Sequence, residues 1–237
     1  MKFNLKKTLK NKLTTIGSWI SIGDSVSTEI MCQNSFDWLT IDMEHTGISN
    51  KAMVDNIRII DLYDLCPIVR VPSKSSSLIK IALDSGARGI IVPMINNVND
   101  AQEAVNNVYY NPDGNRGTGL YRAQKYGKDF ENYRKTANKN ISLIVQIEHY
   151  EAVDNLDDIM SVKGVDGFIV GPYDLSASIN QAGKFDSKEY LKLLNKIESY
   201  INKNKKPGGY HVVHSDKKFL DSILKKGYKF IAYGVDM

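Results

Sequence analysis

Eight short apolar runs, alternating with segments of helical periodicity, limit the fold of this chain more than any other feature. The runs predicted to form strands span 15–22, 36–44, 67–71, 89–94, 142–148, 167–171, 208–213 and 229–235. Between them, apolar residues recur at helical spacing in 75–85, 98–108, 150–160, 187–202 and 217–226. Strands that alternate with helices predict right-handed βαβ units and a parallel sheet. Eight such strands favour an α/β fold of the closed (β/α)8 TIM-barrel type over an open doubly wound sheet.

The size and composition of the chain fit one domain over residues 1–237. With 237 residues, 42% of them hydrophobic and 24% charged, the chain can bury one substantial core. A typical barrel of this type has about 250 residues. No apolar run approaches the roughly 20 residues that span a bilayer, so we expect no membrane association. The basic N-terminus, MKFNLKKTLKNKL, lacks the apolar stretch of a signal peptide and predicts a short helix with a solvated cationic face.

Cysteine content and net charge argue against a disulfide-stabilised protein and against a nucleic-acid-binding protein. Cys32 and Cys66 are too few for a disulfide framework and stand in no metal-binding pattern, which predicts a reduced, cytoplasmic setting. The net charge of +4 is small, and the lysines are spread over predicted helix surfaces without interleaved aromatic residues. We therefore predict no binding to nucleic acid.

Two segments depart from a simple barrel. The connection 96–140 contains NPDGNRGTGLYRAQKYG, which is too polar and glycine-rich for a plain crossover and predicts a functional lid. The sequence also stops directly after the eighth predicted strand, where a barrel normally adds an eighth helix. We expect the apolar flank of that strand to be exposed and then covered by another subunit or another part of the chain, which favours a homo-oligomer.

Two acidic side chains follow buried strands at the predicted rim of the barrel. Glu148 ends SLIVQIE and Asp174 follows GFIVGPY, each where a strand gives way to a helix. Active sites of parallel barrels form at this end of the strands. Gln146 shares a strand face with Glu148. Carboxylates without cysteine or histidine ligands suit a hard cation such as Mg²⁺ or Mn²⁺, so the pair predicts a metal site.

The second and third predicted strands carry charged residues suited to acid–base chemistry. Asp42 and Glu44 project to one side by strand alternation, and His45 follows as either a general base or a loop-capping histidine. Arg70 lies inside the apolar run PIVRVP. It forms either an ion pair within the barrel, for example with Glu44, or a cation directed at developing oxyanion charge.

An aromatic residue and three further histidines are less informative. Trp19 in the first strand forms either an aromatic wall of the site or packing at the bottom of the barrel. We expect core or surface roles for His149, His211 and His214. His149 should face away from Glu148, and the spacing of the other two histidines does not suit two ligands on one strand face.

Taken together, these motifs resemble the HpcH/HpaI family of class II pyruvate aldolases, which includes 4-hydroxy-2-oxoheptanedioate aldolase and 2-dehydro-3-deoxyglucarate aldolase. The resemblance covers nearly the whole chain, from about Gly17 to Asp236. Its blocks are FDWLTIDMEH, PIVRVP, LDSGARGIIVPM, NPDGNRGTG with RAQKYG, VQIE and GVDGFIVGPYDLSAS. It implies a metal-dependent (β/α)8 barrel of the phosphoenolpyruvate/pyruvate type that cleaves a 4-hydroxy-2-oxo acid to pyruvate and an aldehyde.

The resemblance also implies which residues bind the metal and the substrate. Glu148 and Asp174 would hold the divalent ion, Mg²⁺, Mn²⁺ or Co²⁺, and the 2-oxo acid would chelate it. Gln146 would bind substrate, as would the backbone around Tyr173 and Asp174. Trp19 would line the same pocket.

Four residues would carry the chemistry in this family. Arg70 would stabilise the enolate-like transition state, and His45 would act as base. Asp84 in LDSGA would raise the basicity of His45, and Asp42 is a further candidate for orienting that histidine. No lysine is needed to form a Schiff base.

The chain departs from the family pattern in two places, and two alternative functions are kept. Family members continue past the last strand into a helix that docks on a neighbouring subunit of a hexamer. That helix is absent here, so the sequence does not decide whether this chain forms a hexamer. Many members also have threonine where this chain has His149. One alternative is a related carbon–carbon lyase that acts on a CoA thioester or a phosphoenolpyruvate-type substrate. The other is a non-catalytic barrel subunit.

Overall fold

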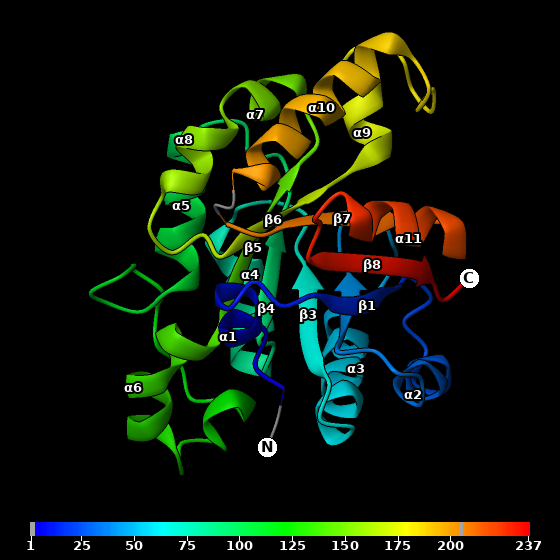
Figure 1. Cartoon of the computed structure of the whole chain (residues 1–237). Helices are drawn as coiled ribbons and strands as arrows, with labels where there is room; N and C mark the ends of the chain where they lie inside the picture. The colour runs from blue at the N-terminus through cyan, green and yellow to red at the C-terminus, as the bar shows by residue number, and fades with distance from the viewer. Residues whose placement is uncertain (1–2, 204–205) are drawn as a thin grey trace.

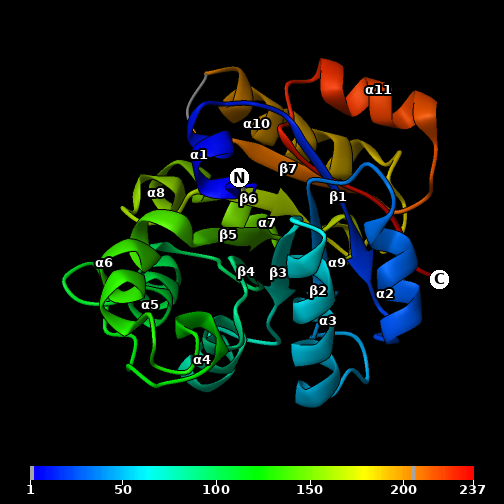
Figure 2. The same cartoon turned by 90° about the horizontal axis from the view of Figure 1, so that it is seen from below.

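The computed structural model describes residues 3–203 and 206–237 and contains eight parallel strands. They pair in chain order into a closed barrel, in which β1 (Thr15–Ile20) also pairs with β8 (Phe230–Val235). The other strands are β2 (Trp38–Asp42), β3 (Cys66–Arg70), β4 (Gly89–Val92), β5 (Ser142–Ile147), β6 (Gly167–Val170) and β7 (Gly208–Val212). Figures 1 and 2 show the strands at the centre of the molecule with helices around them. The predicted (β/α)8 barrel is confirmed.

Helices occupy the connections between the strands. Among the described residues they are α1 (Leu5–Lys10), α2 (Ser25–Cys32), α3 (Asn50–Leu62), α4 (Ser76–Ser85), α5 (Val98–Val108), the 3-10 helix η1 (Arg122–Gln124), α6 (Phe130–Asn140), α7 (Tyr150–Asp154), α8 (Leu156–Ser161), α9 (Pro172–Ala177), α10 (Lys188–Asn202) and α11 (Lys217–Lys225). The helix predicted over 98–108 matches α5. The one predicted over 150–160 is divided at Asn155, which ends α7 and begins α8. The predicted helical segments did not include α2, α3 and α6, whereas α9 lies where a helix was expected after the sixth strand.

Two hydrophobic cores hold the barrel, one inside it and one between it and the helices. Inside, the Trp38 indole stacks on Phe230 with ring centroids 4.3 Å apart. Gly17 makes room for this pair, because a Cβ there would lie 2.1 Å from the Trp38 ring. Leu5 and Leu9 of α1 join the inner core and close this end of the barrel. The interior is therefore filled at the N-terminal ends of the strands, and a site inside the barrel has to lie at the C-terminal ends.

The helix predicted at the N-terminus is confirmed as α1, but its cationic face is not wholly solvated. The Lys6 ammonium lies 3.1 Å from the Asp166 carboxylate and donates a hydrogen bond to the Tyr109 hydroxyl at 3.0 Å. The Lys6 side chain is only 20% exposed. Burial raises the pKa of the Asp166 carboxyl, although the charge of Lys6 opposes that rise. Lys6 thus ties α1 to the barrel instead of facing solvent.

All the predicted strands except the eighth end one or two residues earlier than expected at the C-terminal rim. β2 ends at Asp42 and not at 44, β5 ends at Ile147 and not at 148, and β6 ends at Val170 and not at 171. The polar residues just past these points therefore belong to the rim loops.

The last strand is covered in part by the rest of the chain. No helix follows β8 in the described part of the chain. Even so, Ile231 is fully buried in the outer core and Tyr233 is partly buried. At these two residues the flank is therefore covered by another part of the chain, which was one of the two alternatives expected. Within residues 3–203 and 206–237, no helix combines the length and apolar character needed to cross a membrane.

Candidate active site

A cavity of about 380 Å³ lies at the C-terminal ends of the strands. Its lining includes the predicted site residues Trp19, Asp42, His45, Arg70, Gln146, Tyr173 and Asp174. Glu148 borders the same space, because a Cβ on the lining residue Gly171 would lie 3.1 Å from Glu148 Oε2. The structure therefore brings eight of the nine predicted residues together. The position of Trp19 also excludes the alternative that it packs at the bottom of the barrel.

Arg70 and Asp42 form the best-defined contact of the cavity. They are register partners at the ends of β3 and β2. Arg70 Nε donates to Asp42 Oδ1 at 2.9 Å, and Nη2 donates to Oδ2 at 2.7 Å. Burial alone would raise the pKa of Asp42, but the hydrogen bond and charge of Arg70 hold that pKa below its usual range. The guanidinium also lies over the Trp19 ring, 4.4 Å from its centroid, so both its plane and its position are fixed.

Glu44 is a second carboxylate beside Arg70. Its Oε2 lies 3.3 Å from Arg70 Nη1, so the ion pair considered as an alternative for Arg70 is present. That oxygen is buried and makes no hydrogen bond. Burial raises the pKa of Glu44 to about 7, with the negative charges of Glu148, Asp42 and Asp174 adding to the rise and Arg70 opposing it. The sequence did not assign Glu44 a role of its own in the site.

Glu148 is almost fully enclosed and held by two donors. It is 3% exposed, the Met94 N–H donates to its Oε1 at 2.6 Å, and the Gln146 amide donates to its Oε2. Burial raises its pKa, and the charge of Asp174 adds to that rise, while the two hydrogen bonds oppose it. Gly171 leaves room for both side chains, since a Cβ there would lie 3.1 Å from Glu148 and 3.2 Å from Gln146 and would push them aside. The carboxylate is therefore fixed in direction before any ligand binds.

Asp174 and Tyr173 line the cavity from the segment that follows β6. They are the third and second residues of the short helix α9, which begins directly after β6 at Pro172. Tyr173 is half exposed, and its ring meets that of Phe185 edge to face at 5.1 Å. The negative charge of Asp174 contributes to the raised pKa of both Glu44 and Glu148.

A divalent metal fits this arrangement of charges. Arg70 is the one lysine or arginine in the described lining, so the carboxylates carry more negative charge than the protein neutralises. A dication offsets such an excess in a buried site. The described residues contain no group of three or more histidine, cysteine or acidic side chains that could ligate an ion. Glu148 and Asp174 supply carboxylate oxygens of the kind that Mg²⁺ and Mn²⁺ prefer, and water or substrate oxygens would have to complete the coordination of an ion.

His45 lies at the mouth of the cavity. Its side chain is 61% exposed, and its Nε2 lies 3.8 Å from Glu44 Oε2. Its backbone N–H donates to Asp42 Oδ1 at 3.4 Å. Both oxygens of Asp42 are used by Arg70, so Asp42 orients the loop that carries His45 and not the imidazole itself.

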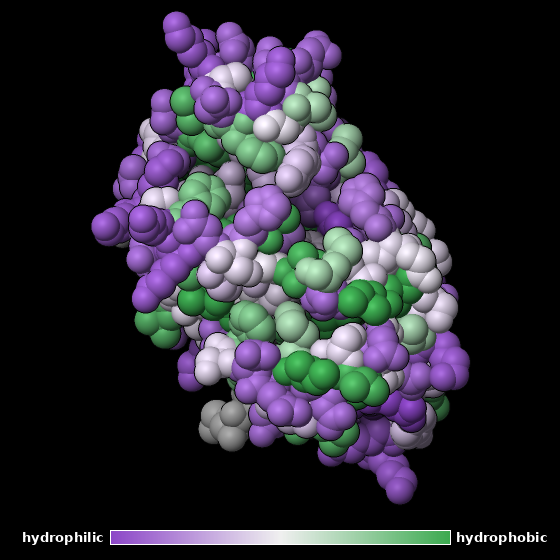
Figure 3. Space-filling view, turned by 90° about the vertical axis from the view of Figure 1, so that its right-hand side faces the viewer, coloured by the Kyte–Doolittle hydropathy of each residue, from purple (hydrophilic) through white to green (hydrophobic). Residues whose placement is uncertain are grey.

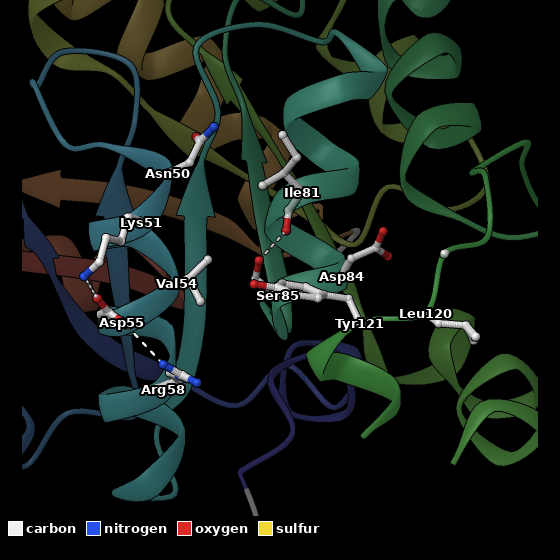
Figure 4. A pocket seen from close by; sticks show the side chains of 11 residues that line it. Asn50, Lys51, Val54, Asp55, Arg58, Ile81, Asp84, Ser85, Leu120 and Tyr121 are labelled. Carbon is white, nitrogen blue, oxygen red and sulfur yellow. Dashed lines mark hydrogen bonds and ion pairs between the residues drawn. The ribbon is translucent and has the colours of Figure 1, made fainter. Parts of the chain in front are cut away.

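Asp84 is the predicted residue that the structure places elsewhere. It lies near the C-terminal end of α4 and pairs with Arg116 at 2.5 Å. Helices of a (β/α)8 barrel run opposite to the strands, so this end of α4 is remote from the rim that holds His45. Figure 4 shows Asp84 in a different cavity, of about 590 Å³, between α3, α4 and the segment 119–121. The expected contact between Asp84 and His45 is not formed within this chain.

The connection 96–140 also lies away from the cavity. None of its described residues lines that space. Arg116 bonds to Asp84, and Arg122 donates to Asp61 on α3 at 2.9 Å and to the Ser85 carbonyl at 3.1 Å. The segment thus packs against α3 and α4, and the predicted lid is not observed.

His211 is a lining residue that the sequence analysis missed. It lies on β7 and faces the cavity, contrary to the core or surface role expected for it. Strand alternation was the available signal, because Tyr210 and Val212 belong to the outer core and His211 must then face inward. His149 instead caps α7, its Nδ1 accepting from the Glu151 N–H at 3.3 Å, and His214 is exposed.

Comparison with known proteins agrees with this geometry. The family model described as HpcH/HpaI aldolase/citrate lyase matches residues 15–237. The hydroxypyruvate/pyruvate aldolase of Roseobacter denitrificans is 36% identical over 98% of this chain and 90% of its own length. The 2-keto-3-deoxy-L-rhamnonate aldolase of Escherichia coli is 34% identical over 98% of this chain and 86% of its own length.

A solved structure extends the similarity to three dimensions. A HpcH/HpaI aldolase/citrate lyase family protein from Burkholderia cenocepacia superposes with a TM-score of 0.92 at 31% identity, covering 98% of this chain and 92% of that one. Aldolase relatives over nearly the full chain make this protein a carbon–carbon lyase and count against a non-catalytic barrel. The chain therefore belongs to the HpcH/HpaI aldolase/citrate lyase family.

Proposed function

We propose that this protein is a metal-dependent aldolase that cleaves a 4-hydroxy-2-oxo acid to pyruvate and an aldehyde. One observation carries the proposal: Arg70 is held rigidly in the same cavity as a cluster of carboxylates that has excess negative charge. A retro-aldol cleavage develops an enolate on the pyruvate half, and Arg70 would stabilise that charge together with a divalent metal that offsets the carboxylates. The aldolase names of the similar proteins agree with this reaction.

Glu148 and Asp174 would hold the metal in this proposal. The ion would supply Lewis-acid polarisation of the 2-oxo group of the substrate. Glu148 is aimed by the Met94 N–H and the Gln146 amide, so its direction does not depend on the ion. Mg²⁺, Mn²⁺ and Co²⁺ all remain candidates, since carboxylate oxygens accept each of them.

Arg70 would stabilise the negative charge that develops on the enolate oxygen. Its contacts to Asp42, Glu44 and Trp19 leave it little freedom, so little reorganisation is needed during the reaction. Gln146 would contact the substrate carboxylate or oxo oxygen through its amide, and Tyr173 would contribute its backbone.

His45 would act as the general base. It would take the proton from the 4-hydroxyl group as the C3–C4 bond breaks, and the bonding electrons would move into the pyruvate enolate, which then gains a proton at C3. Its exposed position allows the proton to pass on to solvent. The contribution of Asp84 to the basicity of His45 stays a prediction without support from the contacts within this chain.

A screen for pyruvate release tests the proposed function. Neutral and acidic 4-hydroxy-2-oxo acids would be incubated with the protein, with Mg²⁺, Mn²⁺ or chelator, and pyruvate followed with lactate dehydrogenase and NADH. We expect release from at least one substrate with metal and none in chelator. Cleavage of a CoA thioester with no release from any hydroxy-oxo acid would favour the alternative lyase instead.

We further propose a cytoplasmic homo-oligomer. Cys32 and Cys66 are both buried and unpaired, which suits a reducing compartment.

The proposed oligomer rests on exposed apolar residues. Ile22, Val26 and Ile30, in and before α2, are each more than half exposed. Figure 3 looks onto the side that carries α2, α11 and the end of β8 and shows hydrophobic residues gathered there. Such a patch favours association with another subunit. Sedimentation velocity would show a species larger than 26.6 kDa.

A further inference from the structure

The imidazole of His211 occupies a defined place in the cavity wall. The residue lies on β7 and lines the cavity beside Trp19, with ring centroids 5.3 Å apart and planes inclined by 35°. Trp19 in turn carries the Arg70 guanidinium on its face. The Trp19 ring therefore separates His211 from the Arg70 guanidinium, the cation that the proposed reaction uses.

The hydrogen bonding of His211 sets its tautomer. Its Nε2 lies 3.4 Å from the Gly234 carbonyl oxygen. A carbonyl can only accept, so Nε2 carries the proton of the neutral ring and Nδ1 is left as an acceptor. Gly234 presents this carbonyl from a point in β8 where φ is +72°, close to the place where the β1–β8 register shifts.

His211 is neutral at physiological pH. Burial, and to a smaller extent the positive charge of Arg70, lower its pKa to about 4, while the Gly234 carbonyl and Asp42 oppose that shift. The ring therefore offers a ligand a hydrogen-bond acceptor and no charge.

The part of the wall that β7, β8 and the segments after them form is otherwise apolar. The lining residues described on β7, β8 and the segments after them are His211, Val213, Val235 and Met237, and the imidazole is their one polar side chain. The groups that would bind pyruvate, Glu148, Asp174 and Gln146, come from β5 and the β6–α9 junction. Arg70, the one cation of the described lining, is already paired with Asp42 and Glu44.

We infer that His211 determines specificity for the aldehyde half of the substrate, with Nδ1 accepting a hydrogen bond from an aldehyde hydroxyl group. This inference rests on the proposed aldolase function and names its substrate class: neutral hydroxyaldehydes, in preference to their deoxy analogues. A site built to bond a hydroxyl group disfavours the analogue that lacks it, because the acceptor is then left unpaired.

The test is the aldol reaction in the direction of synthesis, with pyruvate, Mg²⁺ and either glycolaldehyde or acetaldehyde. We expect the wild-type ratio of kcat/KM for glycolaldehyde over acetaldehyde to exceed unity, and His211→Leu to lower that ratio by about tenfold. His211→Gln keeps an acceptor and a donor and should recover part of the ratio. His214→Leu is the matched control, because His214 is exposed and does not line the cavity, and its ratio should equal that of wild type.

The outcomes separate the inference from the proposed function. Exchange of pyruvate methyl protons with deuterium by the wild-type protein needs the enolate chemistry but no aldehyde, so its absence would contradict the aldolase itself. If exchange occurs but His211→Leu lowers kcat/KM equally for both aldehydes, or leaves the ratio unchanged, the inference is wrong. A lower ratio in His211→Leu that His211→Gln partly restores supports it.

Discussion

Arg70 and Asp42 are register partners on neighbouring strands and share two hydrogen bonds of 2.9 and 2.7 Å. Because both lie at the ends of their strands, the pair stands at the rim with little exposure, 12% for Arg70 and 5% for Asp42. A two-point contact between planar groups fixes orientation as well as charge. The proposed enolate stabilisation depends on this geometry.

Replacing Arg70 by lysine tests that dependence. Lysine keeps the charge but cannot make the two parallel hydrogen bonds, so we expect kcat for retro-aldol cleavage to fall by ~100-fold. Steady-state kinetics measure this, and Mg²⁺ affinity by calorimetry should stay near the wild-type value. A lysine variant with wild-type kcat would show that charge alone suffices.

Gly171→Ala should disturb Glu148 without removing any ligand. The new methyl group would lie 3.1 Å from Glu148 Cβ and Oε2 and 3.2 Å from Gln146 Nε2, and must displace them. We expect Mg²⁺ or Mn²⁺ to bind about tenfold more weakly, as when the orientation of a ligand is lost. Gly117→Ala is the matched control, because its methyl group would meet only Lys80 Cδ at 3.6 Å. Equal metal affinity in both variants would contradict the role given to Gly171.

Glu44 should impose a pH dependence on stability in metal-free protein. Its pKa rises from the model-compound value of 4.5 to about 7 on folding, so the folded state holds this proton more tightly than the unfolded chain does. The contribution of this proton to the free energy of unfolding is fully present below about pH 4.5 and is lost as pH rises to about 7. Glu44→Gln should abolish this loss, leaving the variant more stable relative to wild type at pH 8 than at pH 4.5, by roughly 2–3 kcal/mol.

Urea unfolding in chelator at several pH values measures that difference. The curves of free energy of unfolding against pH should converge near pH 4.5 and diverge toward pH 8. Curves that stay parallel over this range would mean that Glu44 titrates normally in the folded protein.

His45→Ala should affect proton transfer more than binding. Loss of the base should lower kcat by about 100-fold and remove the part of its pH dependence that the base produces. Pyruvate should still bind, since its proposed contacts come from other residues. The pH profile of kcat is the decisive readout, and an unchanged profile would assign the base elsewhere.

The sequence predicted the barrel and most of the residues that meet in the candidate site, because both follow from local patterns. Glu148, Asp174 and Arg70 each come at the end of an apolar strand, and parallel strands bring those ends to one rim. The helix α6 was missed because it is largely polar and buries only Ala137 within it, so it leaves a weak hydrophobic pattern.

Other features depend on contacts that no local pattern encodes. Asp84 is fixed by Arg116, which lies 32 residues further along the chain in a segment whose course could not be read from its composition. The raised pKa of Glu44 comes first from its burial and then from the charges of Glu148 and Asp174, which lie far from it in the sequence. The inward orientation of His211, by contrast, could have been predicted, because its apolar neighbours Tyr210 and Val212 face the outer core.

Proton exchange at the methyl group of pyruvate tests the central claim most directly, because it requires only the metal-assisted enolate and no aldehyde partner. NMR would follow loss of the methyl signal in deuterium oxide for wild type and Asp174→Ala, in excess chelator and then with Mg²⁺. We predict that wild-type exchange stops in chelator and returns with Mg²⁺, and that Asp174→Ala stays folded but does not exchange at the same Mg²⁺ concentration. Undiminished exchange in chelator, or wild-type exchange by Asp174→Ala, would contradict a metal held by Glu148 and Asp174.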